Sequence, residues 1–268
     1  MAEIYNVTEK IKILDSCLRF LTPNSTVLEF GSATGYYTRF MKEELGCEVT
    51  CIEKVPAMAE IGRKIAKKMI VANLECDEWE KELQESTFDY IIFADILEHL
   101  TQPEIIIKKA VKLLKDNGYI LTSIPNIGHN AVLLKLRDAE FDYNETGLLD
   151  NTHIHFFTKK SIFDLFARSH LYCVEEQNKL IRPCDTELES YYANHPLFAL
   201  SLISKPDGHV YRFVHKWSKN PIEEKYDKSI ALPLHSRVWE LFYDTLCRIK
   251  RKRNLSTPTW VGKIFHRL

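Results

Sequence analysis

A glycine-containing turn with two accompanying acids is the part of the sequence best suited to hold a ligand. Glu29 lies in a short apolar run, Gly31 and Gly35 follow it, and Glu53 ends the next apolar run. Backbone amides of such a turn, placed between a strand and a helix, can approach a polar ligand closely. A carboxylate beside the turn repels a pyrophosphate but attracts a ligand that carries an ammonium and a sulfonium. The pattern therefore indicates a positively charged cofactor.

Two other nucleotide-binding loops do not match this turn. A Walker loop requires Gly-Lys-Ser/Thr, which the turn lacks, and a dinucleotide loop requires G-x-G-x-x-G. Gly31 and Gly35 instead enclose Ser-Ala-Thr, which gives the pattern acid-x-G-x-x-x-G. A tight structural turn without a ligand is the alternative for the glycines alone. The spacing of Glu29 and Glu53 relative to the turn favours a ligand-binding site over a purely structural turn.

The segment DILEHL, residues 95–100, brings three metal-ligating residue types together. Asp95, Glu98 and His99 stand at positions i, i+3 and i+4 and would share one face of a helix. Two carboxylates and an imidazole can bind a divalent cation. In the alternative, Asp95 packs near the cofactor while Glu98 and His99 cap the next helix. We prefer this alternative, so the sequence predicts no firm metal site.

The segment LLDNTHIHFFT, residues 148–158, carries candidate proton-transfer groups. Asp150 and His153 are spaced to interact, and His155 alternates with His153. A histidine with a pKa near neutrality can remove a hydroxyl proton, and a carboxylate can orient its ring. We therefore predict His153 as the catalytic base and Asp150 as its orienting partner. His129 is a second candidate base, and any of these histidines could instead be structural.

Short apolar runs and helical segments alternate through the first half of the chain, and they position these residues. The runs cover 26–30, 47–53, 69–75, 87–95 and 119–126, and the helical segments cover 8–21, 35–46, 56–68 and 103–118. This alternation is typical of a parallel sheet with helices on both faces. Ligands of such sheets bind at the carboxyl ends of the strands. Polar residues occupy those ends here: Glu29, Glu53, Asn73, Asp95 and Asn126.

The second half of the chain is less regular. After an insert at about 127–157, the pattern predicts a helix at 158–170 with Thr158 as its N-cap. Two further strands are predicted at 171–177 and 197–205, and the regular pattern ends at Pro206. A final amphipathic helix is predicted at 236–253. The predicted domains are thus 1–206, which would hold the cofactor, and a C-terminal helical extension at 207–268.

Over residues 8–205 the sequence resembles class I S-adenosylmethionine-dependent methyltransferases. The resemblance implies a Rossmann-like, seven-stranded, mostly parallel sheet with helices on both faces. It also implies that Glu29 orients the methionine end of S-adenosylmethionine and that Glu53 accepts the ribose hydroxyls. The chain departs from the family pattern at Asn73, where an Asp is usual, and at Ala33, where a second glycine is usual. The implied cofactor-binding set is Glu29, Gly31, Ser32, Gly35, Glu53, Asn73, Leu74 and Asp95.

Two local resemblances bear on the acceptor. The IPN…GLLD-x-T-H-x-x-F-F-T arrangement is similar to bacterial methyltransferases of cell-surface polysaccharide and lipid-linked glycan synthesis, which implies O-methylation of a sugar hydroxyl. DILEHL resembles a stretch of quinone-pathway and small-RNA 2′-O-methyltransferases that use a divalent cation. An RNA or other small-molecule methyltransferase is an alternative, as is a non-catalytic protein that binds the cofactor and acts as a partner.

Composition and charge limit the classes of protein to which the chain can belong. The chain has 268 residues and a net charge of −1, and none of its apolar runs approaches the roughly 20 residues needed to span a bilayer. Its seven cysteines are scattered without a Cys-x-x-Cys pair, so we expect reduced thiols in a cytoplasmic protein rather than a zinc site or a disulfide framework.

The C-terminal segment is basic. From Cys247 onward there are seven Lys and Arg residues and no acid. This amphipathic end could contact an anionic membrane. We prefer packing on its own domain or on a second subunit of a homo-oligomer. Nucleic acid is not an expected partner, because the rest of the chain is acidic.

Overall fold

The structure is a computed structural model of the chain, and it describes residues 16–83, 86–221, 241, 243–245 and 247–249. The chain divides into two compact units. The first comprises residues 1–126, 152–179 and 212–226, and the second comprises 127–151, 180–211 and 227–268. The predicted boundary at residue 206 divides the chain differently. Most of the predicted insert belongs to the second unit, together with residues 180–211.

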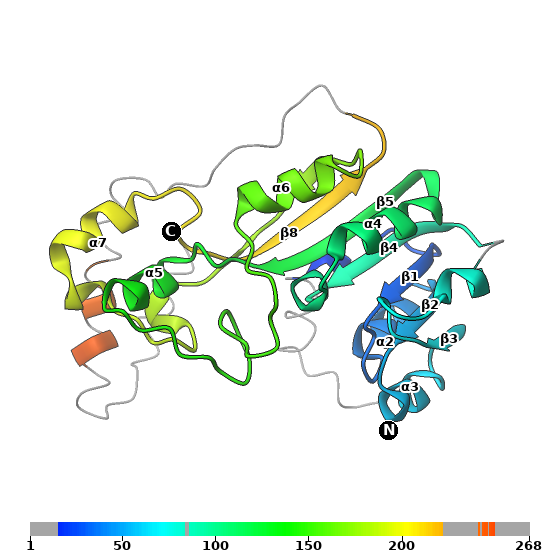
Figure 1. The fold of residues 1–268 in the computed structure, drawn as a ribbon, viewed down its shortest axis with the longest axis horizontal. Coiled ribbons are helices and arrows are strands. Elements are labelled where there is room, and N and C mark those ends of the chain that lie inside the picture. The colour runs from blue at the N-terminus through cyan, green and yellow to red at the C-terminus, as the bar shows by residue number, and fades with distance from the viewer. Residues whose placement is uncertain (1–15, 84–85, 222–240, 242, 246, 250–268) are drawn as a thin grey trace. The chain divides into compact units, whose positions relative to one another are not determined.

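A twisted sheet forms the first unit (Figure 1). Its strand order is β3-β2-β1-β4-β5-β8-β6, and a short β7 (Lys179–Leu180) pairs with β8 outside that path. Strands β1 to β5 are parallel, whereas β8 runs antiparallel to both β5 and β6. The predicted mostly parallel, Rossmann-like sheet is confirmed. The strands are β1 (Thr26–Phe30), β2 (Glu48–Glu53), β3 (Lys68–Val71), β4 (Phe88–Ala94), β5 (Leu114–Pro125), β6 (Tyr172–Glu176) and β8 (Val210–Ser218).

The central strands are apolar because both faces of the sheet are covered. On one face, Val27 of β1 and Ile92 of β4 join a core with the 3-10 helix η1 (Cys17–Phe20) and with α2 (Tyr36–Glu43). The stacked rings of Phe30 and Phe93, with centroids 4.6 Å apart, form part of the core elsewhere on these two strands. Each such fully buried side chain contributes roughly 1.5–3 kcal/mol through burial. This packing holds the strand ends, where the polar residues lie, in fixed positions.

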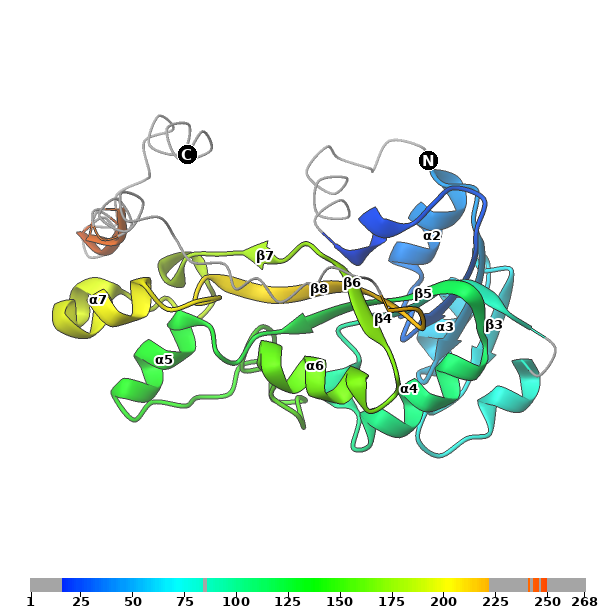
Figure 2. The ribbon, with the colours of Figure 1, turned by 90° about the horizontal axis from the view of Figure 1, so that it is seen from above.

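The helices of the first unit begin where local sequence signals predict. Proline opens both α3 (Pro56–Gly62) and α4 (Pro103–Lys112), where its missing N–H is not needed. Thr158 caps α6 (Lys159–Ala167) and forms a capping box with Ser161, which confirms the predicted N-cap. Figure 2 shows α4 and α6 on one side of the sheet and α2 on the other. Two short 3-10 helices, η2 (Trp79–Leu83) and η3 (Leu97–His99), complete the unit.

Two predictions for the second half of the chain were wrong. The apolar run predicted as a strand at 197–205 forms the helix α7 (Pro196–Ile203), and the strand that completes the sheet is β8. A short apolar run fits either type of element, and here the proline at position 196 begins a helix. β8 was missed because charged residues interrupt it. Arg212 and Lys216 pair there with Asp95 and Glu175, which allows them to lie in a covered strand.

The second unit packs short helices around a small core. Its elements are α5 (Asn130–Arg137), η4 (Pro183–Asp185), η5 (Tyr192–Asn194) and α7. The buried amide of Asn130 donates to Tyr192 Oη at 2.7 Å and to the Leu202 carbonyl at 2.9 Å. These bonds join three elements inside the core, where an unpaired polar group would be costly.

Several predictions concern residues outside the described part of the chain. Of the helix predicted at 236–253, residues 241, 243–245 and 247–249 are described and are helical. The basic residues from 250 onward and the helix predicted at 8–21, as far as residue 15, lie outside it. Contact of the tail with a membrane or a second subunit therefore stays a prediction. Among the described residues, no helix is both long enough and apolar enough to cross a membrane.

Candidate active site

The glycine turn follows β1 and has a backbone that favours glycine at its first position. Gly31 has φ +65°, and a Cβ there would overlap the side chain of Ile96. Ala33 also lies in the left-handed region, with φ +47°. This conformation accounts for the preference for glycine at that position, because it costs other residues about 1 kcal/mol. Ala33 adopts this left-handed conformation without being a glycine.

Glu53, at the end of β2, fastens the turn. Its Oε2 accepts the backbone N–H of Ala33 at 2.8 Å, and its Oε1 accepts the N–H of Val55 at 2.8 Å. The side chain is buried, at 6% exposure. Each carboxylate oxygen has two lone pairs, so one remains on each for a hydroxyl donor. The predicted ribose acceptor is thus fixed in place by the loop that it would serve.

Glu29 is a buried carboxyl beside the same turn. Thr38 Oγ1 donates to its Oε2 at 2.6 Å, and the Cys51 thiol donates to the same oxygen at 3.7 Å. Burial raises the pKa of Glu29 to about 7, although the bonds from Thr38 and Cys51 act in the opposite direction. A cationic group placed beside Glu29 would favour the ionised form. The site is therefore electrostatically sensitive to a positively charged ligand.

The loop after β3 carries the predicted adenine-side residues. Asn73 Oδ1 accepts the Glu75 N–H at 3.1 Å, and the Asn73 N–H donates to Asp77 at 2.6 Å. The Leu74 carbonyl accepts the indole N–H of Trp79 at 3.0 Å. The loop is thus held by its own hydrogen bonds. The role of the Asn73 side chain toward an adenine stays a prediction.

Asp95 lies just beyond β4 in a left-handed conformation, with φ +53°. Its Oδ2 is 3.1 Å from Arg212 Nη1, and its backbone N–H donates to the Ser123 carbonyl at 2.9 Å. Burial raises the pKa of Asp95, while Arg212, Ser123 and two nearby histidines oppose that shift. The ion pair holds Asp95 at the end of the sheet.

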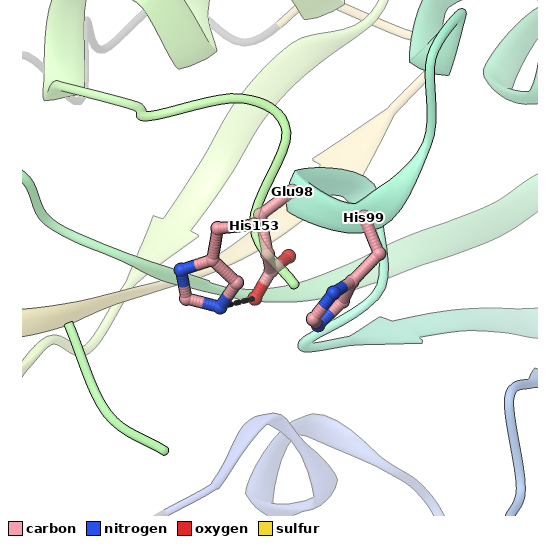
Figure 3. A group of neighbouring side chains, drawn as sticks. All are labelled: Glu98, His99 and His153. Atoms are coloured by element: carbon pink, nitrogen blue, oxygen red, sulfur yellow. Dashed lines mark ion pairs between the residues drawn. The ribbon is translucent and has the colours of Figure 1, made fainter. Parts of the chain in front are cut away.

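Glu98, His99 and His153 converge in the first unit, although His153 is distant from the other two in sequence. Figure 3 shows the Glu98 carboxylate between the two imidazole rings. Glu98 Oε1 is 4.0 Å from His153 Nε2, and the Glu98 side chain is fully buried. The two histidine rings meet edge to face, with centroids 4.9 Å apart. The three residues form one group with a carboxylate at its centre.

Backbone hydrogen bonds bring the two segments of this group together. The Glu98 carbonyl accepts the N–H of Ile154 at 2.8 Å and that of His155 at 3.0 Å. His99 Nδ1 is 3.1 Å from the Thr152 carbonyl. Residues 152–155 are therefore joined to η3 on both sides of His153. This positioning makes the arrangement of the three side chains a property of the fold.

The donor atoms of this group suit a divalent cation. One atom from each of Glu98, His99 and His153 lies within 4.8 Å of the others. Two imidazoles and one carboxylate form a familiar ligand set for first-row divalent metals. The sequence-based set differed, because it contained Asp95 and lacked His153. Helical spacing indicated the neighbours of Glu98, but no spacing rule links residue 153 to residue 98.

The other predicted catalytic residues lie in the second unit. His129 caps α5: its Nδ1 accepts the Ala131 N–H at 3.1 Å, and its Nε2 is 2.9 Å from the Ile181 carbonyl. Burial lowers the pKa of His129 to about 4, so the ring is neutral. Asp150 pairs through its backbone with Asn144. The pairing of Asp150 with His153 stays a prediction.

Comparison with known proteins gives a family and weak relatives. A family model described as a methyltransferase domain matches residues 5–176. The ubiquinone biosynthesis O-methyltransferase of Coxiella burnetii is 26% identical, over 52% of this chain and 70% of the relative. The protein of the same name from Xanthomonas campestris is 28% identical, over 46% of this chain and 52% of the relative.

Solved structures share the fold. A SAM-dependent methyltransferase of Thermotoga maritima superimposes with a TM-score of 0.53 at 18% identity, over 78% of this chain and 88% of that protein. A putative methyltransferase solved with the Trm112 activator of Haloferax volcanii gives a TM-score of 0.53 at 10% identity, over 80% of this chain and 93% of that one. Because the family model covers more than half of the chain, the protein belongs to the methyltransferase-domain family and is an S-adenosylmethionine-dependent methyltransferase.

Proposed function

We propose that this methyltransferase acts on a hydroxyl oxygen, and that Glu98, His99 and His153 form its acceptor-side catalytic group. The observation that supports this proposal is the convergence of a buried carboxylate and two imidazoles after β4. Polar groups at the carboxyl end of a parallel sheet lie where ligands of this fold bind. A nitrogen nucleophile with a free lone pair would need no such group, whereas a hydroxyl has to lose its proton as it attacks.

The cofactor is proposed to bind at the turn after β1. Glu29 would face the cationic methionine end, and Glu53 would accept the ribose hydroxyls with its remaining lone pairs. Gly31, Ser32 and Gly35 would line the turn. Asn73 and Leu74 would lie on the adenine side, and Asp95 would lie at the end of β4 between the two halves of the site. The fixed positions of Glu53 and of the turn support this assignment.

The acceptor-side group fits a divalent cation by the chemistry of its donors. Glu98, His99 and His153 would hold the ion. Their mixed nitrogen and oxygen donors favour Mn²⁺, Zn²⁺ or Fe²⁺ over Mg²⁺, because Mg²⁺ prefers oxygen ligands alone. Such an ion would lower the pKa of an acceptor hydroxyl bound to it. The Glu98 carbonyl, through Ile154 and His155, keeps His153 oriented toward the carboxylate. Alignment of the acceptor with the methyl group then accounts for the remaining rate.

The class of acceptor has two candidates. A glycan or sugar hydroxyl is our first proposal, supported by the GLLD-x-T-H-x-x-F-F-T arrangement. An aromatic hydroxyl is the second, because the curated relatives are named ubiquinone biosynthesis O-methyltransferases. Both acceptors present oxygen to the same catalytic group. His129 and Asp150 remain alternative proposals for the base and its orienting partner.

The proposal is tested with S-adenosylmethionine labelled in its methyl group. Chelator-treated protein is incubated with a panel of nucleotide sugars, lipid-linked glycans, catechols and RNAs, with and without added Mg²⁺, Mn²⁺ or Zn²⁺. We expect an O-methylated product that disappears with chelator and returns with one of the ions. Products methylated only on nitrogen or carbon would contradict the oxygen acceptor. Cofactor binding without transfer to any acceptor would favour the non-catalytic alternative.

A further inference from the structure

A second group of metal-ligating side chains lies in the second unit. None of its members is among the residues proposed for methyl transfer, and two of the three are cysteines. It comprises Cys184, Asp185 and Cys247. Cys184 and Asp185 belong to η4, and Cys247 belongs to the helical residues near the C-terminus. One donor atom of each lies within 4.8 Å of the others, and Cys184 Sγ is 3.9 Å from Asp185 Oδ1. Asp185 is exposed and Cys247 is half-buried, so an ion in solution can reach the group from their side.

We propose that Cys184, Asp185 and Cys247 bind a thiophilic divalent cation, zinc above all, with solvent as the fourth ligand. Zinc–sulfur bonds of about 2.3 Å place two thiolates of a tetrahedral site about 3.8 Å apart. The donor atoms of this group all lie within 4.8 Å of one another, so the two sulfur atoms are at most about 1 Å farther apart than in such a site. Thiolates select zinc over magnesium or manganese, which prefer oxygen. The chemistry of this site thus differs from that of Glu98, His99 and His153.

The surrounding charges favour a cation over a disulfide. Each of the seven cysteines is a free thiol. The Asp185 carboxylate lies beside the two sulfur atoms, with its Oδ1 3.9 Å from Cys184 Sγ, and adds negative charge to the group. A divalent ion would supply a compensating positive charge and take the carboxylate as a ligand, whereas a disulfide would leave the carboxylate without a ligand role.

The geometry of Asp185 is compatible with a ligand role. Its Oδ2 is 4.0 Å from Arg182 Nη1, while its Oδ1 is the oxygen directed at Cys184. The Arg182 guanidinium in turn lies over the ring of Tyr243, 4.6 Å from its centroid. These contacts turn one carboxylate oxygen toward arginine and the other toward the sulfur atoms.

The proposed ion would connect η4 to the C-terminal helical residues. Those residues already contact the rest of the second unit through Asp244, which accepts the Ala193 N–H at 2.9 Å, and through Arg248, which donates to the Ala193 carbonyl at 3.2 Å. Metal sites that join segments distant in sequence stabilise the folded state, because the unfolded chain does not hold the ligands together. The scattered cysteine spacing gave no indication of this site, since it requires two cysteines far apart in sequence.

Cobalt(II) titration of the full, reduced chain tests the proposal. Thiolate ligands give cobalt an intense near-ultraviolet charge-transfer absorption, which carboxylate and imidazole ligands do not give. We expect this absorption to saturate at one ion per chain and to disappear on addition of zinc. C184S and C247S should abolish it, and D185N should weaken cobalt binding by about tenfold or more. C76S, which removes an exposed thiol outside the group, is the matched control and should leave the absorption unchanged.

A second measurement guards against variants that fail to fold. Zinc should raise the melting temperature of the wild-type chain and of C76S, and this shift should shrink in D185N, which keeps both thiols. Absence of the absorption in the reduced wild-type chain would overturn the proposal. So would absorption that persists in C184S or C247S, or a Cys184–Cys247 disulfide in protein that binds no zinc after reduction.

Discussion

The glycine turn proposed to bind the cofactor and the proposed acceptor-side group lie in the same unit but are built in different ways. The turn is local: Glu29, Gly31 and Ala33 follow one another, and only Glu53 comes from the next strand. The acceptor-side group joins η3 to a segment that returns much later in the chain, through bonds to the Glu98 carbonyl. A locally encoded site is visible in residue spacing, whereas a site assembled by the fold is visible only in the structure.

The largest expected effect is the loss of kcat when the acceptor-side group is altered. Glu98→Gln removes the charge between two histidines while keeping the size of the side chain. We expect kcat to fall by about 10²–10⁴-fold, because the group that activates the acceptor hydroxyl is lost. Binding of S-adenosylhomocysteine, measured by calorimetry, should change little. Glu104→Gln, which disrupts only the ion pairs with Lys108 and Arg168 near the surface, is the control. An equal loss of kcat in Glu98→Gln and Glu104→Gln would contradict a specific role of Glu98 in catalysis.

A change in the turn should instead act on cofactor binding. Gly31→Ala places a Cβ against Ile96 in a left-handed backbone, so we expect a loss of about 2 kcal/mol or more in the free energy of unfolding. Cofactor affinity should fall with it, because the turn must shift. Denaturant unfolding and calorimetry measure the two effects.

The double variant Gly31→Ala, Ile96→Ala sharpens this test. Removing the Ile96 side chain relieves the overlap but not the backbone strain, so cofactor affinity should recover in part. Affinity that stays at the level of Gly31→Ala would show that the overlap is not the cause of the loss.

The pH dependence of cofactor binding should report on Glu29. Because burial raises the pKa of Glu29 to about 7, more of the carboxylate is ionised as pH rises through that value. Affinity for S-adenosylmethionine should therefore increase by up to about tenfold per pH unit below the pKa and level off above it. Calorimetry in buffers of different ionisation heat should show proton release on binding. Glu29→Gln should flatten the profile, and an unchanged profile in that variant would exclude Glu29 as its source.

The same shift has a defined sign for stability without cofactor. The folded-state pKa of Glu29 lies above its unfolded value, so its contribution to stability is complete below the unfolded pKa. The contribution is lost as pH rises through about 7. Cofactor binding and the stability of the free protein should thus respond to pH in opposite directions.

The smallest expected effect is at Ala33. Ala33→Gly relieves a left-handed conformation but gives the unfolded chain more freedom, so the unfolding free energy should change by about 1 kcal/mol or less. Cofactor affinity should be kept, in contrast to Gly31→Ala. A loss of affinity as large as that of Gly31→Ala would show that the turn tolerates no change at either position.

The sequence predicted the elements whose signals are local. Thr158 marked a helix start, and continuous apolar runs marked the buried strands, because both signals arise within a few residues. It did not predict α7 or β8. An apolar octapeptide has no period that separates helix from strand, and Arg212 and Lys216 obscured a strand in which ion pairs satisfy their charges.

The same distinction holds for the candidate site. Glu29 and Glu53 were predicted as cofactor-binding residues from their positions at the ends of apolar runs, and the structure shows that Glu53 holds the turn through the Ala33 N–H. Glu98 and His99 were recognised as ligand types, but their partner His153 was assigned a different role, because only the folded chain brings residues 152–155 to η3. His129 looked catalytic by residue type, and its helix-capping role depends on the Ala131 N–H and the Ile181 carbonyl.

Binding of manganese to the full chain in the presence of S-adenosylhomocysteine tests the acceptor-side group most directly, because it needs no knowledge of the acceptor. Electron paramagnetic resonance counts the bound ions, and Mn²⁺ has little affinity for the thiols of the second unit. We predict one Mn²⁺ per chain with nitrogen ligands, lost in Glu98→Gln and retained in Cys184→Ser. No bound Mn²⁺, or binding that is the same in Glu98→Gln, would contradict the account.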